Sequence, residues 1–202
     1  MILFHFKEEY LKKLYLVRHG QTLFNRRAII QGGCDSPLTD LGKRQALAAK
    51  KYFEDKNIVF DHAYVSTQER AVDTLEIITD LPYERLKGLK EWEFGLYEGE
   101  SLELIPPVDP KRQTYGDFFV DFGGESDRDV QERVDSSIKE LMNRKDHEHV
   151  LVVSHGAAIY LFLKKYKDIK HKELYFGNCC VLEFDYDGDK FDFLSLTNHQ
   201  VE

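Results

Sequence analysis

Apolar residues along this chain gather in short runs that alternate with stretches of helical spacing. The runs are rich in β-branched and aromatic residues, and they predict strands buried on both faces of a sheet, at positions 14–17, 60–65 and 149–154. Apolar residues three and four positions apart predict helices over residues 39–53, 66–78, 126–141 and 157–166. Strands that alternate with helices are typical of an α/β domain, in which helices cover both faces of a mostly parallel sheet.

Capping signals begin two of these helices. Ser66 with Glu69, and Ser126 with Asp129, have the spacing of a capping box, in which each side chain bonds the other residue's backbone N–H. We therefore expect the two helices to start directly after Ser66 and Ser126.

Three further runs complete the sheet. A short strand is predicted near residues 85–89, and a C-terminal hairpin over residues 179–186 and 191–196, joined at the turn sequence Asp187-Gly188. The expected fold is a three-layer α/β/α sandwich with a mostly parallel central sheet and a C-terminal hairpin.

Residues 90–124 interrupt this rhythm, because glycine and proline recur among aromatic and acidic residues throughout the segment. A loop of that length is unusual inside a compact domain unless it has a function, so we interpret it as a lid or substrate-facing insertion. Some of its side chains suggest a partly apolar pocket mouth: Pro106, Pro107, Phe118, Phe119 and Phe122. The chain shows no linker and no repeat, which predicts a single domain over residues 1–202, with residues 1–12 as an N-terminal extension.

Composition narrows the class of protein. With 42% hydrophobic and 13% aromatic residues, the 202-residue chain has enough apolar material for a folded core. Asp and Glu number 36 against 28 Lys and Arg, and the formal net charge of −8 argues against a general nucleic-acid binder. Its 3 cysteines are too few for a disulfide framework or a four-ligand zinc site. No segment is apolar for long enough to be an export signal or a membrane span. We expect a cytoplasmic protein with no membrane or nucleic-acid partner.

Arginine and histidine residues stand where the predicted strands end. Arg18 and His19 end the first strand, Arg70 lies in the first turn of the helix after the second, and His155 ends the strand before the last helix. Ligands of open α/β sheets bind at the carboxyl ends of strands, so these four side chains are expected to converge. Guanidinium groups bind phosphate oxygens bidentately, and imidazole serves as nucleophile or proton donor. A glycine follows each histidine and lets a ligand approach the backbone, at Gly20 and Gly156. The pattern favours a phosphoryl-binding site.

The sequence around these residues resembles the signature of the histidine phosphatase superfamily, also called the phosphoglycerate mutase-like family. The first match is Leu16-Val17-Arg18-His19-Gly20-Gln21-Thr22, with Asn25 shortly after. Further matches follow in the family's order: Gly33 with Leu38-Thr39 and Gly42, Ser66 to Thr74, Glu91 with Phe94-Gly95 and Glu98-Gly99, Gly123-Gly124-Glu125-Ser126, and Val153-Ser154-His155-Gly156. The resemblance covers roughly residues 13–197, and the Phe94-Gly95 to Glu98-Gly99 segment looks more like the phosphatase branch.

The resemblance implies a phosphohistidine mechanism. Because Arg18, Arg70 and His155 supply the positive charge that a bound metal ion provides in other phosphotransferases, we expect no metal ion and no cofactor. It implies the following roles: nucleophile, His19; phosphate pocket, Arg18, Arg70 and His155 with the backbone at Gly20 and Gly156; secondary contacts, Thr22 and Asn25; general acid, Glu91. These residue types suit the chemistry, because preorganised cations stabilise a transferring phosphoryl group and a carboxylic acid protonates the leaving alkoxide. The expected activity is hydrolysis of a small organic monophosphate by a metal-independent phosphomonoesterase.

Two other functions stay open. One is a phosphoglycerate mutase, although the mutases of this family typically carry a longer, positively charged insertion after the motif that contains the glutamate. Here residues 99–124 offer Lys111 and Arg112 against Glu100, Glu103, Asp109, Asp117 and Asp121. The other is a non-catalytic module that binds a phosphorylated ligand. The oligomeric state is also open, a homodimer included.

Other polar residues have a structural interpretation. The alternative to a catalytic role for Glu91 is a solvated acidic face, because further acidic residues crowd the same segment: Glu93, Glu98, Glu100 and Glu103. His147 and His149 flank Glu148 with no third ligand spaced with them, which predicts a surface turn rather than a metal site. Glu125 is interpreted as a turn or helix-start residue.

Overall fold

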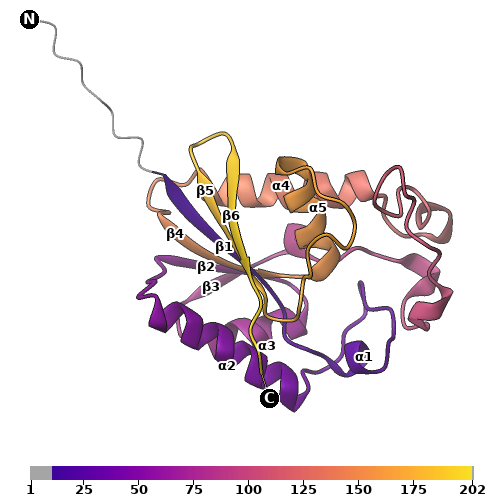
Figure 1. Ribbon diagram of the computed structural model, residues 1–202, viewed down its shortest axis with the longest axis horizontal. Helices are drawn as coiled ribbons and strands as arrows, with labels where there is room; N and C mark the ends of the chain where they lie inside the picture. The colour runs from indigo at the N-terminus through magenta and orange to yellow at the C-terminus, as the bar shows by residue number, and fades with distance from the viewer. Residues whose placement is uncertain (1–10, 202) are drawn as a thin grey trace, which may run out of the picture.

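The computed structural model describes residues 11–201 and contains a six-stranded sheet with helices on both faces (Figure 1). The strand order is β3-β2-β4-β1-β5-β6, in which the first four strands run parallel and β5 and β6 continue as an antiparallel hairpin. The strands are β1 (Lys12–Arg18), β2 (His62–Ser66), β3 (Tyr83–Leu86), β4 (His149–Ser154), β5 (Val181–Tyr186) and β6 (Phe191–Thr197). The predicted α/β/α sandwich with its C-terminal hairpin is confirmed.

Two pairs of helices form the outer layers. The α-helices are α1 (Leu23–Arg26), α2 (Asp40–Asp55), α3 (Glu69–Ile78), α4 (Asp127–Met142) and α5 (Gly156–Tyr166). Successive side chains of a strand point to opposite faces, and β1 follows this rule. Leu14 and Leu16 pack in the core under α4 and α5, whereas Tyr15 and Val17 pack in the core under α2 and α3. Figure 1 shows α2 and α3 on one side of the sheet and α4 and α5 on the other.

The parallel strands end together at one edge of the sheet. Arg18 at the end of β1 pairs in register with Ser154 at the end of β4, and the backbone N–H of His19 donates to the Ser154 carbonyl at 3.0 Å. The residues that follow, His19 and His155, therefore begin their loops side by side. This alignment is what brings the two predicted histidines into one site.

Some local predictions are wrong. Ser66 belongs to β2, and α3 starts after Gln68, whose side chain makes no capping hydrogen bond. Glu69 instead pairs with Arg85 across the surface at 2.7 Å. The capping box of Ser126 with Asp129, by contrast, is confirmed at the start of α4.

The predicted bounds of β3 and β1 also need correction. The strand expected near residues 85–89 ends at Leu86, and the chain then turns into the short 3-10 helix η1 (Lys87–Leu89). Most of the extension expected over residues 1–12 lies outside the described residues, and Lys12 already belongs to β1. Among residues 11–201, no helix has the length and apolar character that a membrane span requires.

Residues 90–124 form an irregular excursion, as predicted. It contains the 3-10 helices η2 (Gly95–Tyr97), η3 (Leu102–Leu104) and η4 (Val120–Phe122). Phe119 is fully buried at its centre, with the rings of Phe94, Tyr97 and Phe118 between 4.9 and 5.5 Å from it. The aromatic residues of this segment thus build a small core of their own.

Candidate active site

His19 lies directly after β1 and is 3% exposed. Its Nδ1–H donates to the carbonyl oxygen of Gly20 at 2.8 Å, and because a carbonyl only accepts, this bond fixes the proton on Nδ1. Burial, together with the nearby Arg70 and Arg18 guanidinium groups, holds the pKa of His19 well below its usual value. His19 is therefore a neutral imidazole whose Nε2 carries a free electron pair.

His155 caps α5 and is completely buried, with its ring centroid 5.2 Å from that of His19. Burial, reinforced by Arg70 and His19, lowers the pKa of His155 well below its usual value. Neither of its ring nitrogens has a hydrogen-bonding partner among the described residues, and the same holds for Nε of Arg18. Buried polar atoms are rarely left unpaired, so these three nitrogens are candidates for contact with a polar ligand.

Arg18 reaches this place across Gly156. Its Nη1 donates to the carbonyl of Phe176 at 2.5 Å, which fixes the guanidinium and leaves Nε turned inward. A Cβ atom on residue 156 would lie 3.2 Å from Arg18 Nε. Glycine at this position gives the guanidinium room to lie beside the start of α5, where the helix dipole also favours an anion.

Arg70 is buried, but its guanidinium is turned toward the loop over residues 31–35. Nη1 donates to the Cys34 carbonyl at 2.9 Å and to Asp35 Oδ1 at 3.0 Å, and Nη2 donates to the Gly32 carbonyl at 3.0 Å. With the Gln31 amide nitrogen facing two hydroxyl groups, the Gln31 oxygen accepts from Arg70 Nε at 2.9 Å. Arg70 thus holds this loop and lowers the pKa of His19 and of His155, and direct contact with phosphate stays a prediction.

Glu91 is 7% exposed and binds the start of α5. Its Oε1 accepts from the backbone N–H groups of Trp92 and Ala158, both at 2.9 Å, and its Oε2 accepts from Ala157 at 3.1 Å. Of the two oxygens, Oε2 has the fewer partners among the described residues. The structure brings Glu91 into the same cavity lining as Arg18, while Glu93 pairs with Lys90 on the surface.

The secondary phosphate contacts implied by the resemblance have partners of their own. Thr22 and Asn25 form the capping box of α1, each accepting the other's backbone N–H at 3.1 Å. The N–H of Gly20 donates to Thr74 Oγ1 at 2.9 Å. Contacts of these three residues with phosphate stay predictions. Asn178, which the sequence analysis did not single out, donates from Nδ2 to the His19 carbonyl at 3.0 Å.

The sequence analysis did not identify Arg133 and Glu125 as residues that position the site. Arg133, on α4, makes two hydrogen bonds of 2.6 and 2.7 Å to the carboxylate of Glu125. The same guanidinium donates to the carbonyls of Gly88 at 3.1 Å, Lys90 at 2.7 Å and Glu91 at 2.7 Å. One side chain therefore fixes the backbone that carries Glu91. The capping signal of Ser126 placed the start of α4, but no local pattern indicates which carbonyls Arg133 reaches.

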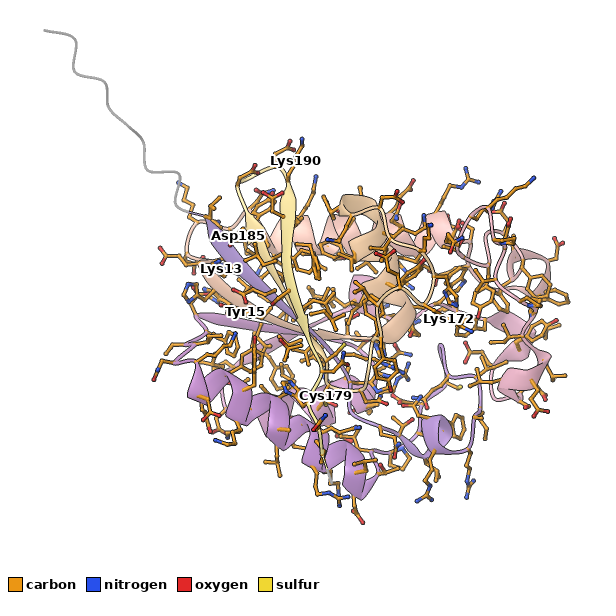
Figure 2. All side chains as sticks on the ribbon, viewed as in Figure 1. Lys13, Tyr15, Lys172, Cys179, Asp185 and Lys190 are labelled. Carbon is orange, nitrogen blue, oxygen red and sulfur yellow. The ribbon has the colours of Figure 1, made fainter. Side chains whose placement is uncertain are left out.

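A cavity of about 390 Å³ lies beside Arg18 and Glu91. Its walls come from the excursion, from α5 and from the segment after α5, where Figure 2 labels Lys172. An apolar mouth is thus confirmed, but the residues predicted for it are wrong. Pro106, Pro107, Phe118, Phe119 and Phe122 lie outside the lining, because the phenylalanines pack inside the excursion.

The prediction of a surface turn at His147 is wrong. His147 is 2% exposed and stacks on His62 with ring centroids 3.8 Å apart, and its Nδ1 lies 2.9 Å from Asp146 Oδ1. His62, Asp146 and His147 could supply three metal ligands at the amino ends of β2 and β4. The two rings are nearly parallel, at 12°, so their in-plane electron pairs do not converge on one point. The absence of a metal requirement stays a prediction.

The chain is similar in sequence to proteins named as phosphatases. The chain is 35% identical over 147 residues to fructose-2,6-bisphosphatase TIGAR B of Danio rerio, an alignment that covers 67% of this chain but 55% of that protein. It is 29% identical over 202 residues to putative phosphoserine phosphatase 2 of Hydrogenobacter thermophilus, covering 92% and 95% of the two chains.

The fold of the chain is similar to that of solved structures. A phosphoglycerate mutase from Bacillus anthracis superimposes with a TM-score of 0.81 at 25% identity, covering 92% of each chain. The sequence profile of the histidine phosphatase superfamily (branch 1) matches residues 14–199, which include His19, Arg70, Glu91 and His155. From its profile, its fold and the residues gathered at the ends of β1 and β4, this chain belongs to the histidine phosphatase superfamily.

Proposed function

We propose that this protein is a metal-independent phosphomonoesterase that hydrolyses a small organic monophosphate through a phosphohistidine on His19. The observation that carries the proposal is a set of three buried nitrogens with no partner among residues 11–201, Nε of Arg18 and both ring nitrogens of His155, beside a neutral His19. A phosphoryl group supplies acceptors for the N–H of Arg18 Nε and for the single N–H of neutral His155, and an electrophile for His19 Nε2.

The reaction has two halves. In the first, His19 Nε2 attacks phosphorus, and the ester P–O bond breaks with its electron pair going to the alcohol oxygen. Glu91, which takes up a proton on Oε2 when the anionic ester binds beside it, gives that oxygen its proton. In the second half, water attacks phosphorus and gives a proton to Glu91, and the P–N bond breaks with its electron pair returning to Nε2. The products are an alcohol and inorganic phosphate, and both residues regain their starting states.

Positive charge does the work that a metal ion does in other phosphotransferases. Arg18 and Arg70 carry permanent charge, and the N-terminus of α5 adds the positive end of a helix dipole beside His155. Because the donors are already in place, they need no reorganisation when negative charge moves during transfer.

Hydrolysis is favoured over mutase transfer by the position of the cations on the excursion. Lys111 and Arg112 line a separate groove with Arg128 and Lys164, and neither contributes to the cavity beside Arg18. The relatives named as phosphatases, including a broad-specificity phosphatase of Saccharomyces cerevisiae that is 28% identical over 194 residues, support the same choice.

The proposal also covers domain organisation, cellular location and oligomeric state. We propose one domain in which residues 90–124 act as the substrate-facing insertion, since they supply one wall of the cavity. Cys34, Cys179 and Cys180 are all free thiols, which is consistent with a cytoplasmic location. A homodimer is testable by light scattering of the purified chain.

Trapping the phosphoenzyme tests the proposal. Rapid acid-free denaturation during turnover of a phosphate ester should yield an acid-labile phosphoenzyme, and chelator should leave the rate unchanged. His19→Ala should lose the phosphoenzyme and about three or more orders of magnitude in rate, whereas His149→Ala, an exposed control, should keep both. Turnover that persists in His19→Ala would exclude the mechanism, and binding without turnover in the unaltered protein would favour the phospho-ligand-binding module.

A further inference from the structure

The cavity beside Arg18 has apolar walls on three sides. Leu102, Ile105 and Val108 come from the excursion, Leu174 and Phe176 from the segment after α5, and Tyr160 from α5 itself. The apolar walls lie next to the expected phosphoryl position, because Arg18 donates to the carbonyl of Phe176 at 2.5 Å. The group that leaves with the ester oxygen therefore enters an apolar space.

Gln113 ties the walls together before any substrate arrives. The Tyr160 hydroxyl donates to the Gln113 carbonyl at 2.8 Å, and the N–H of His171 donates to Gln113 Oε1 at 2.7 Å. The excursion, α5 and the segment after α5 meet at this one residue. A preformed pocket selects by complementarity, because little ordering remains to be done on binding.

Charged groups are scarce in this lining. Arg18 and Glu91 serve the phosphoryl group and the leaving oxygen, which leaves Lys172 as the remaining permanent charge among the described lining residues. His171 also faces the cavity, and burial lowers its pKa, an effect that Lys172 reinforces, so it is neutral at pH 7. Lys172 is exposed at the rim. A second phosphate or a carboxylate placed deep in this cavity would lack a cationic partner, so burying it there costs far more than burying an apolar group.

Building on the proposed function, we infer that the substrate class is the phosphate monoester of an apolar alcohol or phenol with no second anionic group, and that Leu102, Ile105 and Leu174 determine this specificity. This differs from the Danio rerio relative, whose name specifies a bisphosphate. Two bound phosphates need two sets of cations, and apart from Arg18 the described lining of this cavity offers Lys172 at its rim.

A homologous series of alkyl phosphates tests the inference. Ethyl, butyl and hexyl phosphate have leaving groups of similar basicity but increasing apolar area. Each buried methylene should raise kcat/KM about fourfold until the cavity is filled. Hexyl phosphate should exceed the same chain ending in a carboxylate by about 100-fold or more. A kcat/KM that is flat along the series, or highest for the carboxylate, would overturn the inference.

The chain offers a matched pair of variants in the 3-10 helix η3. Leu102 and Leu104 have the same side chain and similar exposure, at 47% and 56%, but Leu102 lines the cavity and Leu104 lies outside its lining. Leu102→Ala should flatten the dependence of kcat/KM on chain length, whereas Leu104→Ala should reproduce the unaltered series. Identical series for the two variants would count against the inference. If no ester is hydrolysed and no phosphoenzyme forms, both the proposed function and the inference are wrong. If esters are hydrolysed but kcat/KM does not depend on chain length, the inference alone is wrong.

Discussion

Glu91→Gln separates the chemical role of Glu91 from its structural one. The carboxylate accepts three backbone N–H groups through two oxygens, and an amide has one oxygen to offer. If the amide oxygen replaces Oε1 and keeps Trp92 and Ala158, the amide nitrogen faces the N–H of Ala157, so a donor meets a donor. That conflict removes one hydrogen bond and the negative charge at the start of α5.

The expected cost in stability follows from these contacts. A buried donor without a partner costs about 1–3 kcal/mol, and a charge lost from a helix N-terminus costs about 0.3–1 kcal/mol. We therefore expect the free energy of unfolding to fall by about 2–3 kcal/mol, which lowers the melting temperature by roughly 4–12 °C in a chain of this size. The variant should still fold at 25 °C, so its kinetics can be measured.

The kinetic effect should depend on the leaving group. Loss of a general acid slows the reaction by about 10²–10⁴-fold when the leaving alkoxide is strongly basic, so hexyl phosphate should show the full effect. Nitrophenyl phosphate, whose leaving group is stable without a proton, should lose much less. The assay compares kcat for the two esters in Glu91→Gln and in Glu93→Gln, whose side chain is 45% exposed and pairs with Lys90. Equal slowing of both esters in Glu91→Gln would refute the acid role, and a selective loss in Glu93→Gln would transfer that role to Glu93.

Three further predictions follow from the packing of the site. Gly20→Ala would put a Cβ atom 2.6 Å from the Gly42 carbonyl, so α2 must shift; thermal unfolding should show a loss of about 1–3 kcal/mol, and an unchanged melting temperature would contradict the close approach. Because burial lowers the pKa of His19 and of His155, the unfolded chain takes up protons below about pH 6.5 that the folded chain does not. The free energy of unfolding is therefore at its full value above that pH and should fall by about 1.4 kcal/mol per pH unit for each imidazole below it. Urea unfolding between pH 7.5 and 5.5 measures this, and a flat profile would contradict the burial of the two imidazoles. Arg133→Met frees the backbone of Glu91, so it should slow alkyl phosphates about 10-fold more than nitrophenyl phosphate; a loss shared equally by both esters would reduce Arg133 to a stabilising residue.

The sheet and the pair of histidines could be predicted because their signals are local. The run over residues 149–154 became β4 with the expected bounds, since an apolar run of that length between polar ends has few other solutions. The order of strands and helices then placed the ends of β1 and β4 together. That topology alone was enough to predict that His19 and His155 lie close together.

Contacts that join distant segments could not be predicted in the same way. Ser66 has the sequence of a helix cap, yet β2 continues through it because pairing with β3 and burial outweigh the local signal. His62 and His147 lie far apart in the sequence, and their stacking depends on where β2 and β4 begin. A pattern read along the chain contains no information about such pairings.

The glutamates of the 91–98 segment show how much of a motif can be structural. Glu98 accepts backbone N–H groups from Gly32 at 3.0 Å, Gly33 at 2.7 Å and Phe94 at 3.0 Å, so it fastens the excursion to the loop that Arg70 holds. Arg70 binds the carbonyls of that same loop, and Arg133 binds those of the Glu91 segment. Two arginines and one glutamate of this site thus bind mainly backbone groups, with Asp35 and Glu125 as further side-chain partners of the arginines. Among the described residues, Nε of Arg18 and the ring nitrogens of His155 have no partner. We therefore expect a phosphoryl group to bind at these nitrogens rather than at the full set of charged residues in the motifs.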